Sequence, residues 1–348
     1  MTADLLDPIL AGVCQCSSPE EDATEWELLN SPHCEERVLV NSQGIDLAVF
    51  TWPPLAAPCR GVVVLYHGID VNTRFEFLRH RSMLSDGAEL GLQYDRSFIA
   101  ALNAAGFLCV GADMQGYGAS GRVDPESIAY FERFSDIERD ALLVYEDAIA
   151  RHPGLPTFLL GISYGGLVVA SLAAFLDARG GADYVGAVLM CPAMSLEKIK
   201  AKPSNAIMLP ISEQLSRYFP KIALDQKSVS HFPMLSVDDH SDDKTGVYTG
   251  KLRARVACET LAAVERARRL APGVTSPLLL VHSRNDTMTD VEGSVHFHAR
   301  AASRDKTLVY ADEAAGPDGD MWHGLTQDPG CEAIAERVCA WLLARVPG

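Results

Sequence analysis

Thr157-Phe-Leu-Leu-Gly-Ile-Ser-Tyr-Gly-Gly-Leu-Val-Val-Ala170 is the stretch that decides the fold. Its first four residues have the apolar character and the length of a buried β-strand, and Gly166–Ala174 is typical of a helix. Between them the pattern Gly161-x-Ser163-x-Gly165 allows a turn too tight for flanking side chains. A strand, turn and helix of this kind raises its serine above the sheet, so we predict that Ser163 is a nucleophile. A glycine-rich turn with an incidental serine is the alternative interpretation.

Outward from this stretch, apolar runs of strand length alternate with helical stretches. A hairpin is expected first, followed by buried strands and by helices between them. The expected strands are Arg37–Asn41, Ile45–Trp52, Gly61–Tyr66, Phe107–Asp113, Thr157–Gly161, Tyr184–Met190, Pro277–His282 and Lys306–Tyr310. The expected helices are Asp95–Ala105, Ser135–Ala150, Tyr164–Arg179, Arg255–Leu270, Glu292–Ala302 and Glu332–Arg345. Such alternation predicts an α/β fold with a mostly parallel sheet flanked by helices.

Three segments depart from the alternation. Residues 1–36 are acidic and lack a clear period, and we interpret them as an N-terminal extension of one domain spanning 37–348. Phe77–Tyr94 is longer than a usual connection and is expected to be an insertion. The stretch at about 194–251 contains several prolines and cannot be one helix, so we predict a cap over the carboxyl ends of the strands. A surface excursion without a role is the alternative.

A serine hydroxyl becomes a nucleophile only when a base takes its proton and a carboxylate orients that base. In a strand–turn–helix fold of this kind the chain order is Ser, acid, His. Asp286 follows the strand expected at Pro277–His282 and is the predicted acid, with Asp290 as the alternative. His323 follows the last expected strand and is the predicted base.

A tetrahedral intermediate also needs two backbone N–H donors for its oxyanion. The amide of Tyr164, directly after the nucleophile, is one candidate. The amide of Ile69, in the loop after the strand Gly61–Tyr66, is the other, and Gly68 gives this loop its freedom to turn. We expect His67 to organise the loop rather than to transfer protons.

Composition excludes several other classes of function. The net charge of −16 would repel phosphate backbones, so no nucleic-acid partner is expected. The nine cysteines have no metal-ligand spacing and are expected to be free thiols. Neither a metal nor an organic cofactor is predicted. Because the start of the chain lacks the features of a secretory signal, we expect a cytoplasmic protein.

The residues quoted so far, together with the glycine-rich loop Asp113–Gly121, resemble the monoglyceride lipase and lysophospholipase group of α/β-hydrolases, of the serine aminopeptidase S33 type. The resemblance runs from about Gly61 to Leu343. It implies an α/β-hydrolase fold with a mobile cap, and an esterase that acts on a small lipid ester. The enzyme would be cytoplasmic and could contact membranes peripherally through the cap.

The resemblance also implies substrate contacts. Residues near the His-Gly pair would hold the alcohol end of the ester, and apolar cap residues would line the acyl path. These candidates are Gly68, Asp70 and Arg74 for the alcohol end, and Ile207, Met208, Leu209 and Leu215 for the acyl path. A monoacylglycerol or a lysophospholipid is the expected substrate, and the oligomeric state is left open.

Two other functions stay open at this point. The segment Tyr248-Thr-Gly-Lys251 resembles plant-type members that also act on caffeoyl esters, so an esterase of small or aromatic acyl esters is one alternative. A ligand-binding protein without catalysis on the same fold is the other.

Overall fold

The computed structural model describes residues 34–80, 92–124, 127–181, 183–195, 197, 211, 213–222, 224, 252–317 and 319–346. Residues 1–33 of the expected extension and most of the expected cap lie outside the described residues. So do the acyl-path candidates Ile207, Met208 and Leu209 and the segment Tyr248–Lys251.

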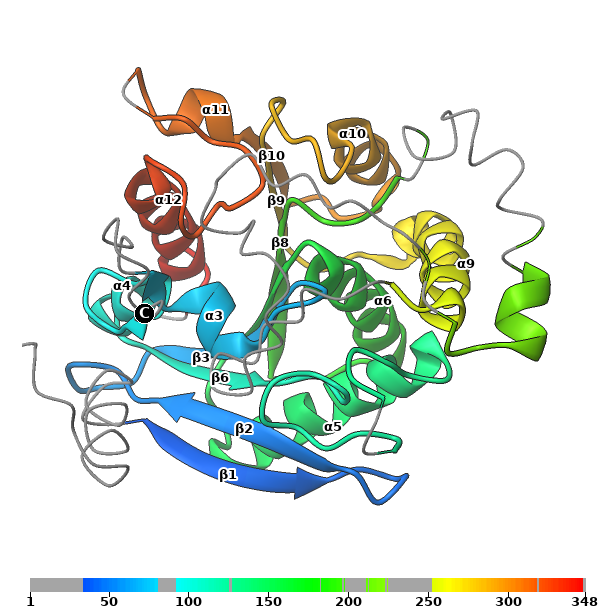
Figure 1. Ribbon diagram of the computed structural model, residues 1–348. Coiled ribbons are helices and arrows are strands. Elements are labelled where there is room, and N and C mark those ends of the chain that lie inside the picture. Colours follow the sequence, from blue (N-terminus) through cyan, green and yellow to red (C-terminus); the bar gives the residue numbers. More distant parts are fainter. Residues whose placement is uncertain are drawn as a thin grey trace, which may run out of the picture.

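Eight strands of the described chain form one twisted sheet, in the order β1-β2-β6-β3-β7-β8-β9-β10 (Figure 1). The β1–β2 hairpin is antiparallel, and β2 pairs antiparallel with β6, whereas all pairs from β6 to β10 are parallel. The bounds are β1 Glu35–Val40, β2 Asp46–Trp52, β3 Gly61–Tyr66, β6 Phe107–Ala112, β7 Thr157–Ile162, β8 Tyr184–Met190, β9 Leu278–His282 and β10 Lys306–Tyr310. The predicted α/β fold with a mostly parallel sheet is confirmed.

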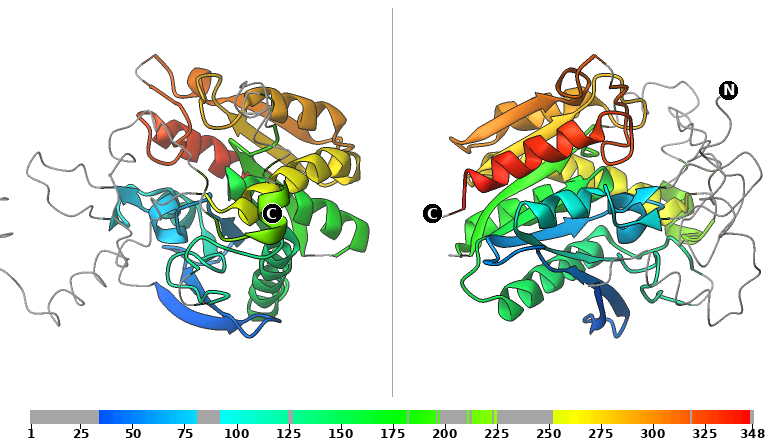
Figure 2. Two further views of the ribbon diagram at one scale, coloured as in Figure 1. Left: turned by 45° about the vertical axis from the view of Figure 1, so that its right-hand side comes forward. Right: turned by 90° about the vertical axis from the view of Figure 1, so that its left-hand side faces the viewer.

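Helices cover both faces of this sheet (Figure 1), and each face has its own hydrophobic core. On one face lie α5 Phe134–Arg151, α6 Tyr164–Arg179, α9 Ala254–Leu270 and α10 Val291–Arg300. On the other lie α3 Thr73–Phe77, α4 Phe98–Ala104, α11 Ala311–Ala314 and α12 Cys331–Leu343. Figure 2 shows α12 running across this second face in its right-hand view.

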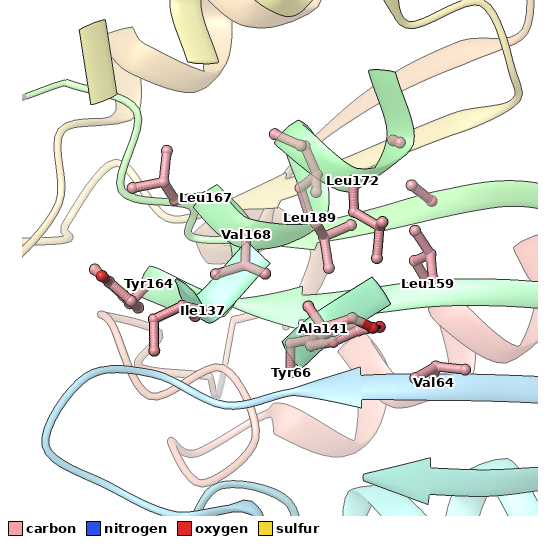
Figure 3. Packing of buried hydrophobic residues seen from close by; sticks show 14 of the residues in the cluster. Val64, Tyr66, Ile137, Ala141, Leu159, Tyr164, Leu167, Val168, Leu172 and Leu189 are labelled. Carbon is pink, nitrogen blue, oxygen red and sulfur yellow. The ribbon is translucent and has the colours of Figure 1, made fainter. Parts of the chain in front are cut away.

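Helix α6 is the central helix of the first face. All six residues of β7 are buried, and most of α6 is buried as well. Figure 3 shows Val168 of α6 on the side of Ile137 of α5, and Leu172 of α6 beside Leu189 of β8. Because α6 is apolar around its whole circumference, it can only be stable between the sheet and other helices. This packing fixes the first turn of α6, which follows Ser163.

Some elements differ from the sequence-based expectation. Strand β1 starts at Glu35, two residues before Arg37, because Glu35 and Glu36 pair with Thr51 and Phe50. The described ends of the expected insertion form a small hairpin, in which β4 (Arg79–His80) pairs with β5 (Leu92–Gln93). A single 3₁₀ turn, η2 (Ala271–Gly273), ends α9.

The described part of the cap segment is joined to the start of α9. Residues 213–218 are helical. After them the amides of Ala254 and Arg255 donate to the carbonyls of Ile222 and Pro220, both at 3.0 Å. Lys221 also forms an ion pair with Asp124, in the segment before α5. These contacts attach residues 220–222 to the helical layer of the first face.

Candidate active site

Ser163 is the single residue that connects β7 to α6. Its φ of 54° and ψ of −113° are values that a residue with a side chain rarely adopts. A Cβ on Gly165 would lie 2.0 Å from the carbonyl oxygen of Tyr66, and one on Gly161 would lie 2.2 Å from that of Gly165. Both positions therefore require glycine, which explains the spacing seen in the sequence. Such a tight turn projects the serine side chain outward from the carboxyl end of β7.

Backbone hydrogen bonds hold this turn against the end of β8. The Ser163 amide donates to the carbonyl of Met190 at 2.9 Å, and the Ala193 amide donates to the carbonyl of Ser163 at 3.0 Å. Cys191 lies between these two partners, and its Sγ donates to the carbonyl oxygen of His323 at 3.2 Å. The turn that holds Ser163 and the loop that holds His323 are therefore both bonded to the end of β8.

Asp286 and His323 meet beyond the ends of β9 and β10. The distance from His323 Nδ1 to Asp286 Oδ2 is 2.7 Å. The other carboxylate oxygen of Asp286 accepts hydrogen bonds from the amides of Met288 at 2.7 Å and Thr289 at 2.9 Å. The alternative acid, Asp290, is the N-cap residue of α10, where its side chain accepts a hydrogen bond from the Glu292 amide. Asp286 is therefore the carboxylate bonded to His323, and Asp290 is a helix cap.

The electrostatics of this pair suit a base held by a carboxylate. Burial alone would raise the pKa of Asp286, but His323, His282 and the Thr289 amide together hold it well below its usual range. Burial alone would lower the pKa of His323, yet Cys191 and Asp286 together raise this pKa well above the ordinary 6.5. Burial raises the pKa of the Cys191 thiol and so favours its neutral form, which leaves Asp286 as the charge that stabilises the imidazolium.

Two side chains on the acid loop support Asp286. Thr289 Oγ1 donates to Asp286 Oδ2 at 2.8 Å. His282, the last residue of β9, has its Nε2 3.3 Å from the same oxygen, while its Nδ1 lies 2.7 Å from Ser294 Oγ of α10. These contacts hold the carboxylate in place while its Oδ2 is also bonded to His323.

Among the described residues, one group of three side chains has the composition of a metal site. A ligand atom from each of Cys191, Asp286 and His323 lies within 4.8 Å of the other two. Asp286 and His323 are already bonded to each other, and the buried thiol favours its protonated form. A metal ion would have to replace the bond between the carboxylate and the imidazole. The expectation that no metal takes part stays a prediction.

The candidate oxyanion loop follows β3. His67 organises it, as expected: its Nε2 accepts a hydrogen bond from the Met114 amide at 2.9 Å, and its Nδ1 lies 2.7 Å from the Gly68 carbonyl oxygen. Burial lowers the pKa of His67, so it stays neutral at the pH where imidazole would otherwise begin to titrate. The amide of Gly68 donates to Glu76 Oε2 at 3.0 Å. Ile69, the donor candidate, packs against the core of the first face.

The second donor candidate, Tyr164, is the first residue of α6, directly after the nucleophile. Its ring lies 5.4 Å from that of Phe134 and 6.2 Å from that of Phe131. The aromatic contacts therefore keep the Tyr164 side chain in the core and its amide at the helix start, next to Ser163.

Asp113–Gly121, the other glycine-rich loop, is held by its own residues. Asp113 accepts hydrogen bonds from the Thr73 amide at 2.8 Å and the Ala119 amide at 2.9 Å. A Cβ on Gly118 would lie 2.1 Å from Asp113 Oδ2, so the loop closes tightly on this carboxylate. These bonds give it the structural role expected for it.

The substrate-binding candidates of the oxyanion loop face different surroundings. Asp70 has a φ of 63°, and its Oδ1 is buried without a hydrogen-bond partner among the described residues. Burial raises its pKa to about 7. The guanidinium of Arg74 lies 4.6 Å from the centre of the Phe50 ring and 3.9 Å from Glu36, on the side of the β1–β2 hairpin. Leu215, in the cap, is partly buried.

Three residues beside the candidate triad were not predicted from the sequence, namely Glu76, Cys191 and Thr289. Each owes its position to a contact between separate parts of the chain, which a single sequence does not reveal. Thr289 alone carried a weak local signal, since a threonine three residues after an aspartate can bond back to its carboxylate.

The sequence matches the family described as serine aminopeptidase, S33 (Hydrolase_4), over residues 85–329. The chain belongs to this hydrolase family. Two relatives of this α/β-hydrolase are the monoacylglycerol lipase of Mycolicibacterium smegmatis and the monoglyceride lipase of Homo sapiens. The first is 26% identical over 307 residues, covering 87% of this chain and 95% of the relative. The second is 28% identical over 295 residues, covering 83% and 86%.

Solved structures support the same fold for this hydrolase. A soluble variant of the Saccharomyces cerevisiae monoglyceride lipase, in complex with a substrate analog, aligns with a TM-score of 0.66 at 17% identity over 92% of this chain and 98% of that one. The monoacylglycerol lipase of Paleococcus ferrophilus aligns with a TM-score of 0.61 at 23% identity over 86% and 99%. The predicted α/β-hydrolase fold and the predicted family are thus confirmed. No helix of the described chain is both long and apolar enough to cross a membrane.

Proposed function

We propose that this protein is a serine esterase that hydrolyses the carboxylic ester of a monoacylglycerol or a lysophospholipid. The observation that carries the proposal is the 2.7 Å contact between His323 Nδ1 and Asp286 Oδ2, in a loop that Cys191 bonds to the end of β8, where the strained turn of Ser163 is also bonded. A proton on Nδ1 that points to the carboxylate leaves Nε2 free to act as a base.

The proposed reaction has two halves. Ser163 Oγ attacks the ester carbonyl while His323 Nε2 takes its proton, and the same proton then goes to the departing alcohol. The acyl group is now on Ser163. Water, activated by His323, attacks the acyl-enzyme, and the carboxylic acid leaves as the serine regains its proton. The amides of Ile69 and Tyr164 would hold the oxyanion in both halves. Asp286 stabilises the imidazolium that forms each time.

Between the two lipid classes we favour a monoacylglycerol. Its glycerol head group is neutral, and a chain with a net charge of −16 offers anionic phosphates an unfavourable field. The names of the two relatives compared above support the same choice. Gly68, Asp70 and Arg74 stay the candidates for contacts with the alcohol end.

The test uses a fluorescent fluorophosphonate, which reacts only with an activated serine, followed by a panel of esters. Wild-type protein should be labelled and should hydrolyse long-chain monoacylglycerols, and Ser163→Ala should do neither. Ser171→Ala is the control, because Ser171 is also buried but lies on α6, about two helical turns beyond the β7–α6 turn. Its labelling and turnover should match those of the wild type.

Each other outcome points to a different function. Cleavage of caffeoyl or short soluble esters alone would contradict the lipid assignment and favour an esterase of small or aromatic acyl esters. Folded wild-type protein that is neither labelled nor active on any ester would contradict the enzyme assignment and favour the binding-protein alternative.

We also propose that the cap meets membrane surfaces peripherally. In its described part, four large apolar side chains are exposed: Ile211 by 44%, Tyr218 by 65%, Phe219 by 63% and Ile222 by 43%. Four exposed large apolar side chains within one short segment are more than scattered surface residues produce, and such a segment is typical of a contact site. A substrate that partitions into lipid would be reached most directly from there.

A further inference from the structure

Besides Asp286, the candidate site has a second carboxylate, that of Glu76, on the side of the oxyanion loop. It lies on α3, a helix that begins after Asn72, whose side chain caps the Phe75 amide at 2.8 Å. The Glu76 carboxylate accepts a hydrogen bond from the Gly68 amide at 3.0 Å. A Cβ placed on Gly68 would lie 2.9 Å from Glu76 Oε2 and 3.6 Å from Ser163 Cβ. The carboxylate and the nucleophile therefore flank the same glycine, one residue before the donor candidate Ile69.

The main chain of Glu76 is bonded to the histidine loop. Its carbonyl oxygen accepts a hydrogen bond from Thr326 Oγ1 at 2.8 Å, and Thr326 follows His323 by three residues. Gln327 adds to this connection, since its Nε2 donates to the carbonyl of Leu78 at 2.7 Å and its Oε1 accepts the His80 amide at 3.1 Å. One short helix thus joins the oxyanion loop to the loop that carries the base.

The Glu76 carboxylate interacts electrostatically with His323. Burial raises the pKa of Glu76, while the Gly68 amide and His323 both favour its ionised form. The other titratable groups near the imidazole are Asp286, Cys191 and Asp328. Around α3 itself, the charged groups are Arg74, which contacts Glu36, and Asp113, which accepts the Thr73 amide.

We propose that Glu76 is a positioning residue of this active site, acting on both of its loops. Its carboxylate holds Gly68 and so sets the direction of the Ile69 amide, its main chain anchors the His323 loop, and its negative charge stabilises the imidazolium. The inference rests on the proposed function, since it assigns Glu76 a role in that same reaction.

The side chain has two separable effects, so two variants test it. Glu76→Gln keeps an acceptor for the Gly68 amide and removes the charge. Glu76→Asp keeps the charge and is one methylene too short to keep the bond. Thr326→Val is the control for the structural connection, because it removes only the hydrogen bond to the main chain.

The kinetic experiment measures kcat and KM on a soluble nitrophenyl ester from pH 5 to 9. Glu76→Gln should lower kcat about 10-fold or more with KM changed less than about 3-fold, because the lost charge acts in the transition state. Its acidic limb should move to lower pH, since the imidazolium is less stabilised. Glu76→Asp should also lower kcat about 10-fold but keep the wild-type pH profile.

A second measurement does not need turnover. In the Ser163→Ala background, NMR titration of His323 should give a lower pKa when Glu76→Gln is added and an unchanged one with Thr326→Val. Wild-type kcat and pH profile in Glu76→Gln, with no shift of the His323 titration, would overturn the role of the charge. Wild-type kcat in Glu76→Asp would overturn the role of the bond.

These outcomes are separate from a failure of the proposed function. If wild-type protein cleaves no ester, the esterase assignment fails, and the His323 titration still reports whether Glu76 acts on the imidazole. If Glu76→Gln does not fold, the kcat of Glu76→Asp decides the role of the bond, and the His323 titration in Glu76→Ala, which also removes the charge, decides the role of the charge.

Discussion

Three residues around the site hold backbone conformations that residues with side chains rarely adopt. Asp70, Ser163 and Cys191 have φ values of 63°, 54° and 36°. Such conformations are each unfavourable by about 1–3 kcal/mol and persist where the surroundings enforce them. All three adjoin the carboxyl ends of parallel strands, where the proposed nucleophile and base lie. The strain is thus concentrated in the loops that carry the proposed chemistry.

Asp70 combines this strain with a buried, unpartnered carboxyl oxygen, so we expect Asp70→Gly to stabilise the protein. Its pKa of about 7 in the folded protein exceeds the usual 3.8, which means that folding favours the protonated form. The wild type therefore loses stability as pH rises between about 4 and 7. The advantage of the variant should grow by about 2 kcal/mol from pH 5 to pH 8.5.

Urea unfolding at both pH values measures this effect. Arg96→Gly is the matched control, because Arg96 has a φ of 57° but an exposed side chain, and its gain should not depend on pH. If the stability gain depended on pH equally in both variants, the pH dependence could not be assigned to the Asp70 carboxyl. A loss of activity on monoacylglycerols in Asp70→Gly, with activity on simple esters kept, would support a substrate contact.

Asp286 and Asp290 can be told apart by a pair of isosteric variants. Asp286→Asn should lower kcat by about 10³- to 10⁴-fold, because an amide favours the wrong tautomer of His323 and does not stabilise its charge. Asp290→Asn should stay within about 3-fold of the wild type, because asparagine also caps a helix well. A large loss in Asp290→Asn alone would contradict the choice of acid.

At the scale of elements, the buried strands and long helices were predicted closely. A parallel strand covered on both faces is a continuous apolar run, and β3 and β8 match their expected bounds at both ends. Elements shorter than about two turns, such as α3 and α11, carry too few residues to show a period. Their formation depends on capping and tertiary contacts, as with Asn72 at α3.

The residues of the candidate site also fall into two groups, those that the sequence could predict and those that depend on tertiary contacts. Ser163, Asp286 and His323 could be proposed because each follows a recognisable strand in a fixed order. Glu76 could not, because its partner Gly68 is set by the packing of α3, and its neighbour Thr326 lies 250 residues further along the chain.

The turn between β7 and α6 should be the least tolerant connection of the fold. Gly165→Ala would place a Cβ 2.0 Å from backbone at the end of β3, so we expect a loss of about 3 kcal/mol or more, or insoluble protein. Gly181→Ala is the control, since open space surrounds that position. It should change stability by less than about 0.5 kcal/mol. Thermal unfolding measures both variants. Comparable losses of stability in the two would contradict the expectation that the β7–α6 turn tolerates substitution least.

At the scale of the whole molecule, charge and the apolar cap cluster act in opposite directions. A net charge of −16 repels anionic lipid, whereas the exposed side chains of the cap favour contact with any bilayer. Binding to anionic vesicles should therefore rise as salt screens the repulsion, and binding to zwitterionic vesicles should change little.

Sedimentation with vesicles of phosphatidylglycerol or phosphatidylcholine at 20 and 200 mM salt tests this balance. Phe219→Ser should weaken binding to both kinds of vesicle and leave turnover of a soluble ester unchanged. Phe175→Ser, an exposed phenylalanine on α6, is the control and should bind as the wild type does. Equal loss in both variants would contradict a role for the cap.

The placement of the site at one edge of the sheet has a practical consequence at the other edge. Ser163 follows the carboxyl end of β7, and the connection that enters the neighbouring parallel strand β8 at the opposite end contains Gly181, where an added side chain would meet nothing within 4 Å. The length of β7 separates the two ends by about 20 Å. A fluorophore or an affinity handle attached at Gly181 would therefore report on the enzyme from a place far from the reacting groups.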